Sequence, residues 1–151
     1  MKTETIQRLI YSTAITLDAE NFKPFLALCS EDFHYSVVAY SPDLGMDMTW
    51  LNHDRKSMQD MLAMIPQHVR LKGCFKRHVS VYFVDPTADG QSASVVSSVL
   101  LIHTDSVGVS KVFAAGNYED LVDLTGDTPL LKKRLVRLDT RDLSPGIHIP
   151  V

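Results

Sequence analysis

The chain has 151 residues, with 15 basic and 18 acidic side chains and a formal net charge of −3, so one domain is expected and nucleic-acid binding is not. Hydrophobic residues make up 45% of the chain, which excludes global disorder, and the two isolated cysteines do not suggest a disulfide framework. The N-terminus lacks the apolar core of a signal peptide and no apolar run is long enough to span a bilayer, so a cytoplasmic protein without membrane contact is expected.

The N-terminal third of the chain predicts two helices and a strand. Apolar side chains recur at spacings of three and four over residues 3–17, which indicates an amphipathic helix. A short second helix follows, with Asp18 or Asn21 as its N-cap and an inner face that runs from Phe22 to Cys29. Residues 33–40 then switch to the period of two that is typical of a strand.

A third helix is predicted over residues 55–65, after an extended stretch at 49–53. Asp54 is its expected N-cap, and Pro66 ends it because the residue before a proline is disfavoured in the α conformation. The helix is rich in methionine, which either packs in the core or forms an adhesive partner surface; the spacing favours the core. These residues are Met58, Met61 and Met64, with Met64 off the main stripe.

The second half of the chain reads almost entirely as β. Four strands are expected, at residues 76–84, 92–104, 109–123 and 130–139, and the short turns between them predict antiparallel pairing. Strands of this length tend to curl. The sequence therefore predicts one α+β domain over residues 1–151, with three N-terminal helices on a curved, mostly antiparallel sheet. This is the cone called cystatin-like or nuclear-transport-factor-like.

Sequence detail resembles the small (beta) subunits of Rieske-type aromatic-ring-hydroxylating dioxygenases, above all those of terephthalate dioxygenase and salicylate hydroxylase. The resemblance lies in residues 32–35, 77–78, 112–120 and 130–139, and in the final triplet Ile149-Pro150-Val151. Two departures concern the subfamily and hence the substrate. Ser36 stands where related subunits often have an arginine, and methionines stand late in the third helix where they often have an Asp-Arg pair.

The resemblance implies a structural subunit of a multicomponent oxygenase that hydroxylates an aromatic substrate, by family an aromatic acid, in aromatic catabolism. The large alpha subunit of such enzymes holds a Rieske 2Fe-2S cluster and a mononuclear iron, while the beta chain holds no cofactor and is not catalytic by itself. Alpha and beta commonly assemble as three of each, and the resemblance also allows a homotrimer of beta chains alone. Electrons come from NAD(P)H through a reductase.

The residues themselves agree with a chain that lacks a redox centre. A Rieske cluster needs two cysteines and two histidines, but Cys29 and Cys74 each lack a histidine two residues away. A mononuclear iron site needs two histidines and a carboxylate that converge. No HxxxH or HxxH pair occurs among the six histidines, which are His34, His53, His68, His78, His103 and His148.

Several residues are candidates for structural or interface roles. Alternation along residues 76–84 places Arg77 on the apolar face and His78 on the other, so Arg77 is the expected buried charge, with Asp120 or Asp139 as its partner. The full set of candidates is Arg77, His78, Tyr118, Asp120, Arg134 and Asp139. Gly116 interrupts a strand, which indicates a bulge or a close backbone approach. The apolar tail Ile147–Val151 is expected to be exposed and to dock on a partner.

Two alternatives remain open. A free-standing cone-fold enzyme, such as a dehydratase, isomerase or cyclase, would use a pocket inside the curved sheet with an acid–base pair and a hydrogen-bond donor. Its pocket candidates are Asp32, His34, Tyr40 and Trp50. The other alternative is a binding module for a small apolar ligand. A deep polar cavity would favour the enzyme, and a cavity plugged by Trp50 and by Phe and Met side chains would favour the subunit.

Overall fold

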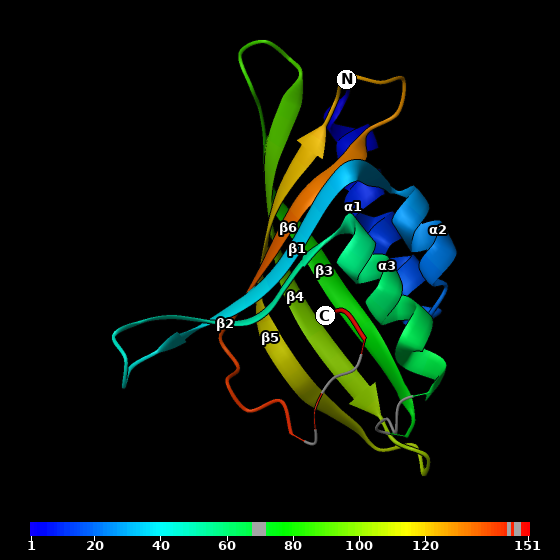
Figure 1. Cartoon of the computed structure of the whole chain (residues 1–151), viewed down its shortest axis with the longest axis vertical. Helices are drawn as coiled ribbons and strands as arrows, with labels where there is room; N and C mark the ends of the chain where they lie inside the picture. Colours follow the sequence, from blue (N-terminus) through cyan, green and yellow to red (C-terminus); the bar gives the residue numbers. More distant parts are fainter. Residues whose placement is uncertain (68–71, 145, 147–148) are drawn as a thin grey trace.

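Six strands form one curved sheet in the order β2-β1-β6-β5-β4-β3, and helices cover one side of it (Figure 1). The computed structural model describes residues 1–67, 72–144, 146 and 149–151. The helices are α1 (Thr3–Asp18), α2 (Phe22–Ala27), α3 (Arg55–Met64) and the 3-10 turn η1 (Ile65–Gln67). The strands are β1 (Cys29–Ser41), β2 (Met46–Asp54), β3 (Cys74–Pro86), β4 (Ser92–Thr104), β5 (Ser110–Asp123) and β6 (Leu130–Leu138).

The pairing of the strands makes one continuous sheet from two parts of the chain. Strands β3 to β6 form an antiparallel meander, and β1 and β2 form an antiparallel hairpin. Strand β1 joins the meander by parallel pairing with β6. The predicted α+β class with N-terminal helices on a curved, mostly antiparallel sheet is therefore confirmed.

Helix α1 buries the apolar stripe that its sequence predicts. Ile6 and Ile10 are fully buried and pack in one cluster with Val95 of β4 and Val122 of β5. Leu17, at the end of the helix, joins the main core cluster instead. No described helix is both long enough and apolar enough to cross a bilayer.

Helix α3 begins and ends where its sequence predicts. The Asp54 carboxylate accepts a hydrogen bond from the backbone N–H of Ser57 at 2.8 Å, which caps the first turn. Met58 is fully buried whereas Met64 is exposed, so the interpretation of this face as core is confirmed. The cap predicted for α2 is wrong in part, because Asn21 occupies the N-cap position without a side-chain hydrogen bond and Cys29 already belongs to β1.

Strand β3 departs from the predicted alternation beyond Val81. The register shifts between Val81 and Phe83, so Tyr82 has no partner on β4. The extra residue of a bulge turns every following side chain to the opposite face. Phe83, expected inside, is exposed, and Val84, expected outside, packs against the α1 cluster. The predicted inner position of Phe83 is therefore wrong.

Gly116 lies where two backbones meet closely. A Cβ at this position would collide with the carbonyl oxygen of Arg137 and the Cα of Leu138 on the neighbouring strand β6. The predicted close approach is confirmed. The register shift between β4 and β5 lies elsewhere, between Leu101 and Ile102.

Candidate functional site

A polar cluster lies inside the cone, between the sheet and the helices. Tyr35 comes from β1, Arg77 from β3, Tyr118 and Asp120 from β5, and Arg134 from β6. All five are at most 5% exposed. Four of the six strands therefore bring polar side chains to one interior region.

Arg134 and Asp120 form the centre of this cluster. The Arg134 Nε donates to Asp120 Oδ1 at 2.9 Å and Nη2 donates to Oδ2 at 2.8 Å, which is a two-point pair between fully buried side chains. The guanidinium carbon also lies 3.8 Å from the centre of the Tyr118 ring. Burial lowers the pKa of Arg134, but the adjacent Asp120 carboxylate outweighs this and raises it, so the guanidinium stays charged.

Arg77 is buried as predicted, but its predicted partners are wrong. Its Nη1 donates to Asp18 Oδ1 at 2.7 Å, and its backbone N–H donates to the same oxygen at 3.0 Å. Asp120 is taken by Arg134, and Asp139 is exposed beyond the end of β6. The reason is the strand order, which places β4 between β3 and β5 and packs the end of α1 against β3.

The C-terminal segment occupies the interior of the cone (Figure 1). The backbone N–H of Val151 donates to the Tyr35 hydroxyl at 2.9 Å, and the Tyr118 hydroxyl donates to the Val151 carbonyl oxygen at 3.0 Å. Arg77 Nη2 donates to the Pro150 carbonyl oxygen. Burial raises the pKa of both tyrosines, so their hydroxyls stay neutral. Nothing in the local sequence around Tyr35 signals this contact.

The prediction of an exposed docking tail is therefore wrong for the part that the structure describes. Ile149 and Val151 are buried in the main core cluster. Two apolar side chains gain more from burial inside the cone than from exposure, and their backbone groups find partners there. Ile147 and His148, which belonged to the same prediction, lie outside the described residues.

The four pocket candidates of the enzyme alternative do not converge inside the cone. Asp32 is exposed, accepts a hydrogen bond from Ser30 at 2.7 Å and pairs with Lys132 at 3.4 Å. His34 shares a surface depression with Asp32, while Phe33 and Tyr35 face the interior. Tyr40 is exposed near the end of β1 and Trp50 lines a different pocket; His78, an interface candidate, is exposed on β3.

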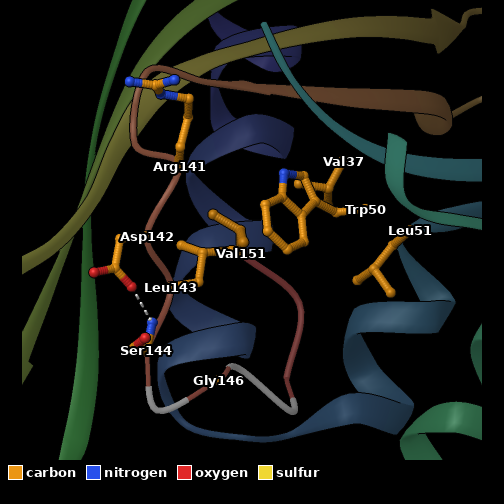
Figure 2. A pocket seen from close by; sticks show the side chains of 9 residues that line it. All are labelled: Val37, Trp50, Leu51, Arg141, Asp142, Leu143, Ser144, Gly146 and Val151. Carbon is orange, nitrogen blue, oxygen red and sulfur yellow. Dashed lines mark hydrogen bonds between the residues drawn. The ribbon is translucent and has the colours of Figure 1, made fainter. Parts of the chain in front are cut away.

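An open pocket of about 460 Å³ lies between the β1–β2 hairpin and the segment that follows β6 (Figure 2). Val37, Trp50 and Leu51 line one side, and residues 141–144 line the other, with Val151 between them. The Asp142 carboxylate accepts a hydrogen bond from the Ser144 backbone at 2.9 Å. Among the described residues, the lining offers apolar contact but no acid paired with a base, and Trp50 lies at the wall of this open pocket and does not plug the interior.

The cysteines and histidines of the described residues do not fit a redox centre. No group of three or more His, Cys, Asp or Glu side chains in the described part of the chain could hold a metal ion. Cys29 is buried, and burial raises the pKa of its thiol to about 12 despite the opposing charge of Arg134. Cys74 is exposed at the start of β3, apart from Cys29. These residues do not match the ligand set of a Rieske cluster.

Comparison with known proteins gives relatives over the whole chain, although no family model matches it. The chain is 33% identical over 156 residues to the beta subunit of the methanesulfonate monooxygenase hydroxylase of Methylosulfonomonas methylovora, covering 98% of this chain and 86% of that protein. It is 32% identical over 151 residues to the beta subunit of 2-aminobenzenesulfonate 2,3-dioxygenase of Alcaligenes sp, covering 100% of both.

Solved structures share the fold at lower identity. A protein of Novosphingobium aromaticivorans described as the beta subunit of an aromatic-ring-hydroxylating dioxygenase superposes with a TM-score of 0.80 at 20% identity, covering 92% of this chain and 90% of that one. A protein of the same organism described as a scytalone dehydratase gives 0.65 at 23% identity, covering 91% and 83%. The cone alone is thus shared by chains of different activity.

Proposed function

The chain belongs to the family of beta subunits of ring-hydroxylating oxygenases, and from this membership we propose that it is the non-catalytic subunit that holds a larger alpha subunit in an oxygenase complex. The observation that carries the proposal is 32% identity to one such subunit over the full length of both chains. Both relatives are named as beta subunits, which describes components of larger assemblies.

The proposal assigns the redox chemistry to the partner. The Rieske cluster and the mononuclear iron would lie in the alpha subunit, and the ligand sets that they require are not found among the described residues of this chain. We propose an assembly of three alpha and three beta chains in the cytoplasm. The contribution of this chain would be contact surface and not reacting groups.

The filled interior supports a structural role over an independent enzyme. An enzyme of this shape needs space inside the curved sheet for its substrate, and here Ile149, Pro150 and Val151 occupy that space. Asp32 and His34, the acid and base of the alternative, lie on the outer side of β1. The described lining of the open pocket beside Trp50 offers no acid–base pair in their place.

The names of the relatives narrow the substrate class that we propose. One acts, by its name, on methanesulfonate and the other on 2-aminobenzenesulfonate, and both substrates are small organic acids. We extend this class to the oxygenase that contains the present chain, with an aromatic acid as its substrate in aromatic catabolism. The alpha subunit would make the contacts that choose among such acids.

The β1–β2 hairpin is the surface that we propose for contact with alpha. It projects from the body of the molecule (Figure 1). Tyr40, Leu44 and Met46 are each more than half exposed on it, and Met48 is partly exposed. Apolar side chains on a projecting arm mark an interaction site, and methionine adapts well to an irregular partner surface.

Co-expression with a neighbouring large-subunit gene that carries paired Cys-x-His motifs tests the function. The two chains are expected to co-elute in size exclusion, with iron in the same fractions and a mass that fits three of each. A small chain that elutes alone, never together with an iron-containing partner, would overturn the proposal. Multi-angle light scattering decides between the mixed hexamer, the beta homotrimer and other stoichiometries.

A further inference from the structure

The interior of the cone offers a matched set of hydrogen-bonding partners for one extended stretch of backbone. The Tyr35 hydroxyl accepts from the N–H of Val151, the Tyr118 hydroxyl donates to its carbonyl oxygen, and Arg77 donates to the carbonyl oxygen of Pro150. Each of these three side chains is more than nine-tenths buried. They come from β1, β5 and β3, so the sheet itself positions the partners.

The proline of the segment fits this set of partners. Buried backbone N–H groups without an acceptor destabilise a protein, and Pro150 has no N–H to satisfy. The described interior gives hydrogen bonds to the carbonyl oxygen of Pro150 and to the N–H and one main-chain oxygen of Val151. A segment with proline at this position therefore needs no hydrogen-bond acceptor for an N–H there.

Apolar contact and a buried cation complete the site. Ile149 and Val151 are 4% and 1% exposed, within the cluster that holds both tyrosines. The Arg134 guanidinium lies over the Tyr118 ring at 3.8 Å. Arg134 Nη1 and Arg77 Nε are buried without a hydrogen-bond partner among the described residues, so the interior has spare donors beyond those in use.

We propose that this interior is a binding site for an extended apolar-Pro-Val peptide, which the chain fills with its own residues 149–151. The interior would thus be a peptide site that an internal ligand occupies. The inference concerns this chain alone, so its test is separate from the co-elution that tests the oxygenase assembly.

A site that recognises the segment through side chains keeps its affinity when the covalent connection is cut. A protease recognition sequence inserted after Asp142, in an exposed segment, allows the chain to fold before cleavage. The freed C-terminal fragment is expected to stay with the body through size exclusion. An excess of fluorescently labelled N-acetyl-Ile-Pro-Val peptide is expected to displace it and to bind in its place. If the fragment separates from the body immediately after cleavage and the labelled peptide does not bind, the proposal is overturned.

A chain that lacks residues 149–151 gives a second measurement. The N-acetyl-Ile-Pro-Val peptide is expected to raise the melting temperature of this shortened chain, or to restore its folding if the deletion unfolds it, because a ligand that binds the folded state alone stabilises it. The intact chain, whose site is filled, is expected not to respond. The absence of any effect on the shortened chain would contradict the proposal.

Variants of the site test recognition by hydrogen bonds. Made in the chain that lacks residues 149–151, Tyr35→Phe and Tyr118→Phe are each expected to weaken binding of the peptide by about tenfold, because each leaves a buried backbone group without its partner. Tyr40→Phe, an exposed tyrosine on the same strand, is the matched control and is expected to bind the peptide unchanged. N-acetyl-Ile-Ala-Val is expected to bind more weakly because alanine adds an N–H. Equal affinity in all four cases would mean unspecific apolar contact and would overturn the proposal.

Discussion

Arg134 and Asp120 are both fully buried, so each depends on the other for its stability in the interior. Arg134→Met leaves the Asp120 carboxylate buried without a counter-ion, and we expect a loss of about 3–5 kcal/mol in the free energy of unfolding. The double variant Arg134→Met with Asp120→Leu removes both charges and is expected to recover most of this loss. Urea denaturation followed by circular dichroism measures both effects.

Arg137 on the same strand provides the control for this pair. It donates to Glu119 and Asp47, each at 2.7 Å, but its side chain is 41% exposed. Because solvent screens exposed ion pairs, Arg137→Met is expected to cost at most about 1 kcal/mol. A loss for Arg134→Met as small as that for Arg137→Met would contradict the proposed dependence on burial.

The stability that Asp54 gives to the start of α3 depends on pH. The hydrogen bond from the Ser57 backbone lowers the pKa of its carboxyl below the usual 3.8, so the folded state prefers the ionised form. The stabilisation is therefore present above that value and is lost as the pH falls through the lower pKa of the folded state. The difference in melting temperature between the natural chain and Asp54→Ala is expected to be largest at neutral pH and to shrink below about pH 4.

Asp54→Asn separates the cap from the charge. Asparagine caps helices as well as aspartate, so this variant is expected to melt close to the natural chain at neutral pH. Asparagine does not ionise, so the difference in melting temperature between Asp54→Asn and Asp54→Ala is expected not to change with pH. Thermal melts between about pH 7 and about pH 3 measure these differences. If the melting temperatures of the natural chain and of Asp54→Ala differ by the same amount at every pH, the Asp54 carboxylate does not stabilise the helix through its charge.

At the scale of elements, Gly116 fixes how closely β5 and β6 approach. Gly116→Ala would place a methyl group against the backbone of Arg137 and Leu138, which cannot move without breaking the strand pairing. We expect a marked fall in melting temperature or loss of soluble protein. Gly126→Ala is the matched control, because its methyl group would meet nothing closer than ordinary contact distance. Equal melting temperatures for the two variants would contradict the close approach.

The elements with a local signal were predictable, and the long-range contacts were not. The stripe of α1, the Asp54 cap and the long strands follow from periodicity within a few residues. The bulge at Tyr82 turned Phe83 outward because one unpaired residue shifts the phase of a strand without any change in composition. The pairing of Arg77 with Asp18 depends on which strand lies beside α1, and the sequence does not encode that strand order locally.

At the scale of the whole molecule, the same limit applies to the candidate site. Residues 149–151 read as an exposed tail because apolar-Pro-apolar has no secondary-structure signal. Their burial is decided by the vacant interior that the curved sheet and helices leave, which exists only after the other elements have assembled. The family resemblance was confirmed by relatives across the full chain, whereas the positions of the pocket residues could be obtained only from the fold.

A docking surface can bind its partner without supporting the fold of its own chain where its side chains are exposed, and the tip of the β1–β2 hairpin around Leu44 and Met46 meets this condition, whereas the rest of β1 belongs to the core. Met46 and Met48 are exposed on the edge strand β2, so Met46→Asp with Met48→Asp is expected to leave the melting temperature of the free chain unchanged. The same change buries two carboxylates in the proposed contact with alpha and is expected to weaken co-elution at least about tenfold.

Val107→Asp is the matched control for this double variant. Val107 is 82% exposed in the turn between β4 and β5, away from the hairpin (Figure 1). It also gains a carboxylate at an exposed apolar position, and it is expected to co-elute with alpha like the natural chain. If Val107→Asp abolishes co-elution and the double methionine variant does not, the partner surface lies at the β4–β5 turn.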